Sequence, residues 1–143
     1  SEAAALALHA MVLMAAAPDR PMSIRAAAER LKVSEAHLSK VMQRLAKEGL
    51  VRSARGRHGG FLPVRSLGGI ALGRIYEAID GRCLATKCLF NIPGCDARRC
   101  ILGGVLEKVD NQLRSYLSGT KLSDLADVYR GGRGHAKKDN RNR

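Results

Sequence analysis

Apolar residues recur along the first part of the chain with the spacing of helices. Residues 2–16 are rich in alanine and leucine and stop just before Pro18, which predicts a first, mostly apolar helix. Ser23 can cap a second helix over Ile24–Leu31, because a serine side chain accepts a hydrogen bond from a free N–H group of the first turn. Ser34 can cap a third helix in the same way. We therefore expect three helices in close succession.

The third predicted helix has two distinct faces. Its apolar residues follow the i, i+3, i+4, i+7 spacing of a helix that packs on a core, at Leu38, Val41, Met42 and Leu45. Its other face carries polar side chains, at His37, Ser39, Lys40, Gln43 and Arg44. We expect the first face to be buried and the second to meet solvent or a polar partner.

A β-hairpin is predicted directly after these helices. Leu50–Ser53 and Phe61–Val64 are short extended runs on either side of a glycine-rich turn. Pro63 lacks an N–H group and should restrict its strand to the edge of a sheet. Helix, turn, capped helix and hairpin form the order of a winged helix-turn-helix. The predicted fold class is therefore mainly α with a small β-hairpin wing.

Helical patterns return in the second half of the chain. Leu67–Ile79 predicts a fourth helix, despite its glycines, and Thr120–Leu125 predicts one last helical turn. Between them lies an apolar stripe that predicts a long fifth helix, at Leu102, Val105, Leu106, Val109, Leu113, Tyr116 and Leu117. At 143 residues, the chain has material for one domain and a dimerisation element rather than for two independent cores.

Composition narrows the class of partner. The chain has a formal net charge of +12 and contains two Phe, three Tyr and no Trp. A basic chain suits a polyanion, and the scarcity of aromatic rings disfavours single-stranded or RNA partners, whose bases stack on such rings. Duplex DNA is the partner that we expect. The apolar run near residue 3 is too short to span a bilayer, so we expect a cytoplasmic protein with no membrane partner.

Six polar residues are the candidates for DNA contact: Ser34, His37, Lys40, Arg44, Arg55 and Arg57. The first four lie on the third helix, whose N-terminal end would reach base edges in the major groove. The two arginines flank Gly56 at the hairpin tip, where a guanidinium can enter the minor groove. Each residue taken singly fits a solvated surface equally well. From Ser34 to Ser66, however, seven Lys/Arg stand against two Glu.

The chain divides into three predicted parts. Residues 1–66 form a winged helix-turn-helix DNA-binding domain, and residues 67–129 hold a connecting helix, a cysteine loop and the long helix. Residues 130–143 form a basic tail with six Lys/Arg against one Asp and no apolar face, which predicts disorder. The sequence contains no Ser/His/Asp arrangement, phosphate loop or paired carboxylates, so an enzyme is not expected.

All four cysteines lie on the loop between the fourth and fifth predicted helices. Cys83, Cys88, Cys95 and Cys100 have the spacing C-x4-C-x6-C-x4-C, and the loop also contains proline and glycine. Thiols gathered on one irregular loop can hold an iron–sulfur cluster, bind zinc, or exchange between thiol and disulfide. In a reducing cytoplasm, ligation or sensing is favoured over structural disulfides.

The segment SIRAAAERLKVSEAHLSKVMQRLAKEGLVRSARGRHGGFLPVRS, followed by the cysteine loop, an apolar helix and KLSDLAD, resembles the bacterial Rrf-two family of transcriptional regulators. The resemblance covers about residues 3–128 and is most specific in VSEAHLSKVMQRL, in RGRHGG and in the distance from Cys100 to KLSDL. It implies a homodimeric repressor or activator with a winged helix-turn-helix, dimerised through the long helix after the cysteines.

The same resemblance implies roles for single residues. In members of the family, three loop cysteines bind a two-iron or four-iron cluster, and the state of the cluster alters operator binding. Carried over by position, the cluster ligands are Cys88, Cys95 and Cys100, the major-groove residues are Ser34, His37 and Lys40, and the minor-groove residue is Arg55.

Two departures from the family pattern affect the ligand set. The cysteine spacing is shifted, and Cys83 is an extra thiol that could serve as a fourth ligand. Where some relatives have an acidic ligand from the other subunit, the best-matching residue here is Ala5, which cannot ligate, and Glu2 matches poorly. His9 lies on the first helix, where some relatives also place a ligand, although a single helical histidine is more often packed or exposed.

The sequence thus predicts a dimeric, DNA-binding transcriptional regulator that senses iron, nitric oxide or redox state through a cysteine-ligated iron–sulfur cluster. The alternative is a cluster-free regulator that works by thiol–disulfide switching of the same cysteines or by binding a small molecule. A third interpretation is that the cysteines bind zinc or have no chemical role.

Overall fold

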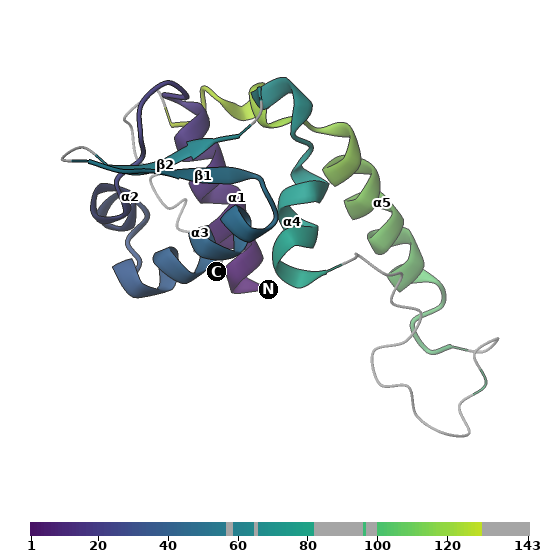
Figure 1. Ribbon diagram of the computed structural model, residues 1–143. Helices are drawn as coiled ribbons and strands as arrows, with labels where there is room; N and C mark the ends of the chain where they lie inside the picture. The colour runs from purple at the N-terminus through teal and green to yellow at the C-terminus, as the bar shows by residue number, and fades with distance from the viewer. Residues whose placement is uncertain (57–58, 65, 82–95, 97–99, 130–143) are drawn as a thin grey trace, which may run out of the picture.

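The computed structural model describes residues 1–56, 59–64, 66–81, 96 and 100–129. These residues form a mainly helical fold with one β-hairpin, which confirms the predicted fold class (Figure 1). Its elements are α1 (Glu2–Ala15), α2 (Ile24–Leu31), α3 (Glu35–Lys47), β1 (Val51–Ala54), β2 (Gly60–Pro63), the 3-10 turn η1 (Leu67–Gly69), α4 (Leu72–Asp80), α5 (Val105–Gly119) and the 3-10 turn η3 (Leu122–Leu125). Within this part of the chain, no helix is both long and apolar enough to cross a membrane.

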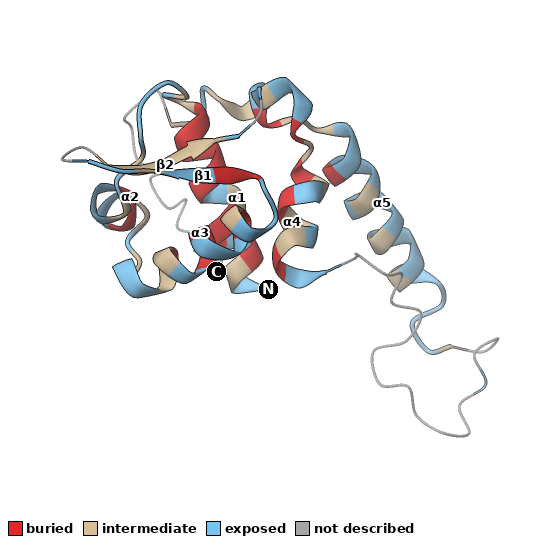
Figure 2. Ribbon diagram, viewed as in Figure 1, coloured by how far each residue is buried: buried red, intermediate tan, exposed pale blue. Residues whose placement is uncertain are grey.

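Helix α1 runs through the core of the protein. Nine of its residues are buried, and it packs against α2, α3, α4, β2 and η3. A helix that is apolar nearly all round is stable only when other elements enclose it, as Figure 2 shows for α1. The same core contains Met11, Leu38, Ile75 and Leu122, so it joins the helix-turn-helix to the second half of the chain.

Helices α2 and α3 begin at the predicted serine caps. The Ser34 side chain accepts a hydrogen bond from the His37 N–H at 3.2 Å, and Ser23 caps α2 in the same way. Lys32 has a left-handed backbone (φ 56°) that ends α2 and leaves a short turn before α3. The predicted apolar stripe of α3 is buried throughout, which confirms the assignment of its two faces.

The wing is the antiparallel pair β1–β2, in which Val51 lies opposite Pro63. The structure adds a bridge that the sequence pattern did not predict: the Met22 N–H donates to the Phe61 carbonyl at 2.8 Å, and the Phe61 N–H donates to the Met22 carbonyl at 3.0 Å. β2 therefore has a neighbour on each side at Phe61, and Pro63 lies beyond that bridge. Gly60 permits the close approach, because a Cβ there would lie 2.3 Å from the Met22 carbonyl oxygen.

The predicted fourth helix over Leu67–Ile79 was too long at its start. The chain forms η1, breaks at Ile70 and Ala71, and enters α4 only at Leu72. Two glycines at the start disfavour a continuous helix. The break also has its own partners, because Leu72 donates to the Thr120 carbonyl and the Ile70 carbonyl accepts from Leu122. A distant segment of the chain thus replaced the local helical bonds.

Helix α5 extends away from the rest of the fold (Figure 1). It begins at Val105, after Gly103 and Gly104 with positive φ of 53° and 78°, so Leu102 precedes the helix instead of lying on it. The predicted last turn is confirmed as η3, where the Lys121 N–H donates to the Asp124 carboxylate at 2.9 Å. The predicted basic tail lies outside the described residues.

Candidate functional site

The outward face of α3 holds the predicted major-groove residues. Ser34 and Lys40 are exposed, and His37 is half-buried one turn after the cap. Ser34 and His37 lie at the N-terminal end of α3, and Lys40 lies on the face opposite the buried stripe. The free N–H groups and the dipole make a helix N-terminus attractive to anions. Hydroxyl, imidazole and ammonium groups at this end suit base edges and phosphates.

The wing places Arg55 directly after β1, in an exposed position. Gly56 follows with φ of 117°, a conformation that side chains rarely adopt and that lets the hairpin turn tightly. Arg57, the second predicted wing residue, lies outside the described residues. The hairpin of β1 and β2 projects from the helices in Figure 1. Arg55 follows the last residue of β1, on the side of the turn, where a guanidinium can reach a groove of DNA.

The Arg44 side chain, another predicted DNA contact, forms a hydrogen bond to a different helix of the protein. Its guanidinium donates a hydrogen bond to the main-chain carbonyl of Ile79, in the last turn of α4. In this structure the side chain therefore reaches across to α4. Its predicted contact with DNA stays a prediction. Neither helix pattern contained a signal for this bond, because its partners are 35 residues apart and one of them is a backbone atom.

The cysteine segment is described only at its end. Cys100 is half-buried, and its carbonyl accepts a hydrogen bond from the Gly103 N–H at 2.9 Å, in the turn that leads into α5. Cys83, Cys88 and Cys95 lie outside the described residues. The part of the chain that the structure describes contains no group of three or more His, Cys, Asp or Glu residues that could hold a metal ion. Four thiolates are nevertheless the donors that an iron–sulfur cluster prefers, so the chemistry of the set fits.

His9 contacts the end of the described chain. Its Nδ1 shares a hydrogen bond with the Tyr129 hydroxyl at 2.7 Å, and the Arg30 guanidinium lies 5.3 Å from the centre of the Tyr129 ring. Arg30 also donates to the Tyr129 carbonyl. Burial raises the pKa of the Tyr129 phenol, although the Arg30 charge acts in the opposite direction. Glu2 and Ala5 line a cavity of about 340 Å³ beside this cluster.

The apolar stripe on α5 is largely exposed. Val105, Val109, Leu113 and Tyr116 keep 42–58% of their surface in contact with solvent, and only Leu117 is buried, at 6%. Figure 2 shows the contrast between α5 and the red, buried surfaces of α1 and α4. Ile101, just before the helix, is 98% exposed. Several large apolar side chains exposed along one helix are typical of sites where another molecule binds.

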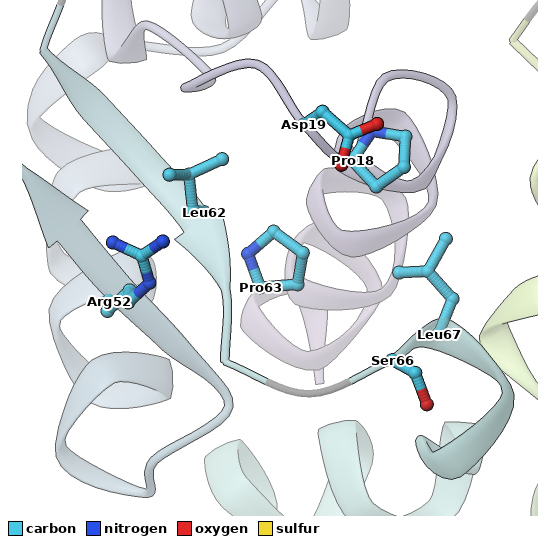
Figure 3. A pocket seen from close by; sticks show the side chains of 7 residues that line it. All are labelled: Pro18, Asp19, Arg52, Leu62, Pro63, Ser66 and Leu67. Atoms are coloured by element: carbon cyan, nitrogen blue, oxygen red, sulfur yellow. The ribbon is translucent and has the colours of Figure 1, made fainter.

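An open cavity of about 600 Å³ lies between the wing and the loop after α1 (Figure 3). Arg52 from β1 and Asp19 from the loop are the charged groups that line it, among prolines and leucines. Sequence reasoning missed this cavity, because three segments that are distant along the chain form it. It involves none of the predicted site residues.

Helix α3, with its serine cap, has the position of the helix that reads the major groove in winged-helix proteins, and we call it the reading helix. Together with the hairpin wing and the helical core, it defines a winged-helix DNA-binding protein. A family model described as an iron-dependent transcriptional regulator, Rrf2, matches residues 1–128. The chain belongs to this family. Its relatives are transcriptional regulators, so the protein is a regulator and not an enzyme.

Individual relatives support this assignment. The chain is 35% identical to YffB, an HTH-type transcriptional regulator of Lactococcus lactis, over 84% of this chain and 81% of that protein. It is 31% identical to IscR of Yersinia pseudotuberculosis over 76% of this chain and 66% of IscR. Among solved structures, CymR, the global cysteine regulator of B. subtilis, has a TM-score of 0.73 at 25% identity, covering 90% of this chain and 95% of CymR. For IscR of T. potens the TM-score is 0.69 at 25% identity, covering 95% and 92%.

Proposed function

We propose that this transcriptional regulator acts in the cytoplasm as a homodimer whose affinity for duplex DNA depends on iron or redox state. The cysteine segment would be the sensor, with an iron–sulfur cluster held by Cys88, Cys95 and Cys100, and with Cys83 as a candidate fourth ligand. The observation that carries the proposal is the position of Cys100. It lies at the turn that leads into the exposed stripe of α5, and it follows the reading helix, the wing and α4 along the chain. A change at the cysteines would act on both.

DNA binding rests on the α3 face and the wing. Ser34, His37 and Lys40 would contact the major groove, while Arg55 and Arg57 would contact the minor groove or phosphates. The net charge of +12 adds attraction that does not depend on sequence. Binding should therefore weaken steeply as salt rises.

Dimerisation rests on α5. A second copy of the chain can cover the stripe of one α5 with that of its partner, which removes apolar surface from water on both sides. Two wings and two reading helices would then face DNA together. The spacing of the two α3 helices would determine the spacing of the half-sites.

The proposed cluster rests on donor chemistry and on family. Sulfur from Cys88, Cys95 and Cys100 suits iron, and the family model is described as iron-dependent. A bound cluster would supply a group that is lost or altered by oxidants and by iron shortage. The chain's own part would be to hold the segment in one arrangement while the cluster is present, and so to place α4 and α5.

A cluster-free thiol switch is the second candidate. The described cysteine, Cys100, is partly exposed, so an oxidant or another thiol can reach it. CymR, a structural neighbour of this chain, is a regulator of cysteine, and an oxidised form of the Staphylococcus aureus CymR has the same fold at 23% identity. A disulfide between two of the four cysteines would then constrain the segment in place of a cluster.

One set of measurements tests both candidates. Protein purified without oxygen is analysed for iron, sulfide and visible absorbance, and its binding to a duplex selected from a random pool is measured at several salt concentrations. We expect iron and sulfide in the wild type and their loss in Cys100→Ala, with DNA binding retained but no longer responsive to oxidant. Colourless, iron-free wild type would favour the thiol switch. A Cys100→Ala protein that still responds like wild type would contradict sensing by this segment.

A further inference from the structure

The bond between Arg44 and Ile79 joins the reading helix to the element that enters the cysteine segment. Arg44 lies in the last turn of α3, and Ile79 lies in the last turn of α4. Gly81 ends α4, and Cys83 follows two residues later in the sequence. The hydrogen bond from Arg44 to Ile79 therefore joins α3 directly to the helix that leads into the cysteine segment.

The bond is of a strong kind. The last carbonyls of a helix lack partners within the helix and carry partial negative charge, so a cation there is favoured. α4 has no basic residue of its own in its last turn. Arg44 supplies that cation from another helix, and a hydrogen bond from a charged donor is stronger than one between neutral groups.

The packing around the bond makes it able to transmit a displacement. Leu45, the residue after Arg44, and Ile75 of α4 are fully buried, and Ile79 of α4 is buried with only 3% of its surface exposed. Close-packed side chains of this kind move together as the helices move. A shift at the end of α4 would therefore reach the C-terminal end of α3 through Arg44 and the packed residues beside it.

We propose that Arg44 is a positioning residue that couples the state of the cysteine segment to the placement of the reading helix. This inference rests on the proposed function. In one state of the segment, the last turn of α4 offers the Ile79 carbonyl to Arg44, and α3 is held in the arrangement seen here. In the other state the end of α4 moves, the bond is lost, and α3 takes a different position on DNA. Arg44 thus has its role without contacting the operator.

Two other roles for Arg44 make different predictions. If its guanidinium bound a DNA phosphate, its removal would weaken binding equally in both states and would reduce the salt dependence by about one charge. If it only stabilised the fold, its removal would lower the melting temperature without changing the response. Lys47 is a matched control, because it is an exposed cation in the same last turn of α3 with no hydrogen bond to α4 among those described.

The experiment compares two preparations of each full-length protein. One is kept without oxygen in dithiothreitol, and the other is treated with ferricyanide and EDTA, which remove iron and oxidise thiols. The dissociation constant for the selected duplex is measured in both, and their ratio is the response; couplings between sites commonly correspond to ratios of about 5–150. We expect Arg44→Ala to bring this ratio to within about twofold of one, Arg44→Lys to restore part of it, and Lys47→Ala to keep it.

The possible results distinguish a failure of the proposed function from a failure of the inference about Arg44. A wild type with no response would contradict the proposed function itself, and the inference with it. An Arg44→Ala protein with the wild-type ratio, or with equal loss of affinity in both preparations, would overturn the inference and leave the proposed function intact. If Arg44→Ala does not fold, Gly81→Ala replaces it: φ of 77° at Gly81 strains any side chain there and disturbs the end of α4 without touching α3. This variant should also reduce the ratio, and an unchanged ratio would count against the inference.

Discussion

Helices α3 and α5 carry the same kind of apolar stripe, but only one stripe is covered. In α3 the four stripe residues are buried against the core, with Leu38 fully enclosed. In α5 the stripe is largely open: Leu117 is buried near the contact with α4, and Leu106 is half-buried. The comparison teaches that helical periodicity predicts a buried face without telling which molecule buries it. For α3 the partner is its own chain, and for α5 we propose a second copy.

The largest effect is expected in the covered stripe. Leu38→Ala removes a fully buried side chain and leaves a cavity, so we expect the free energy of unfolding to fall by about 2–5 kcal/mol. Urea unfolding followed by circular dichroism measures this. The change should hold at every protein concentration. A loss under about 1 kcal/mol would mean that α3 is less firmly packed than this structure describes.

Changes in the exposed stripe of α5 should weaken the dimer and leave the stability of the monomer unchanged. Val109→Glu with Leu113→Glu should leave the monomer folded but raise the dimer dissociation constant at least about 100-fold, because burying unpaired carboxylates in an interface is costly. Analytical ultracentrifugation measures the dissociation constant. Asn111→Glu, an exposed change elsewhere on α5, is the control. A double variant that dimerises like wild type would exclude α5 as the interface.

In the wing, Gly60 lies in close backbone contact with Met22. Gly60→Ala places a methyl group against the Met22 carbonyl, so we expect the bridge to open and stability to fall by about 1–3 kcal/mol. Loss of hydrogen-exchange protection at the Met22 and Phe61 amides would be the direct sign. Gly68→Ala is the matched control, because its nearest neighbour is the Ser123 hydroxyl at 4.0 Å. Equal effects in the two variants would mean that the close approach at Gly60 is unimportant.

The smallest effect is expected at Arg55, an exposed residue that we propose contacts DNA. Arg55→Ala should leave stability unchanged and weaken binding to the selected duplex by about 1–2 kcal/mol, since it removes one groove contact. Fluorescence anisotropy measures the affinity. Arg74→Ala on α4 is the control, with the same change of charge away from the wing. Identical losses in both variants would reduce Arg55 to a contribution of general charge.

The parts of the fold that were predicted correctly depend on local chemistry. The caps at Ser23 and Ser34 and the faces of α3 follow from side chains that act within one or two turns. The errors arose where distant segments compete with local preference. The bridge from Met22 to Phe61 and the break before Leu72 both depend on partners far along the chain.

The candidate site divides in the same manner. The outward position of Lys40 could be read from periodicity, because an exposed face follows from a buried one. Those of Ser34 and Arg55 could be read from the predicted helix cap and hairpin turn. The bond from Arg44 to Ile79 could not, since a guanidinium on a polar face looks alike whether it meets water, phosphate or a carbonyl. The cavity beside Arg52 was hidden for a similar reason, because its walls come from separate segments.

By itself, the sequence determined helices α1, α2 and α3, the serine caps of α2 and α3, the hairpin and the gathering of four cysteines into one segment. These features depend on neighbours along the chain, whose distances are set by covalent geometry. Only the tertiary structure decided that α1 is enclosed, that Arg44 reaches α4 and that the stripe of α5 remains open. Those outcomes depend on which surfaces meet in space, and a stripe's energy of burial is the same whichever apolar surface covers it.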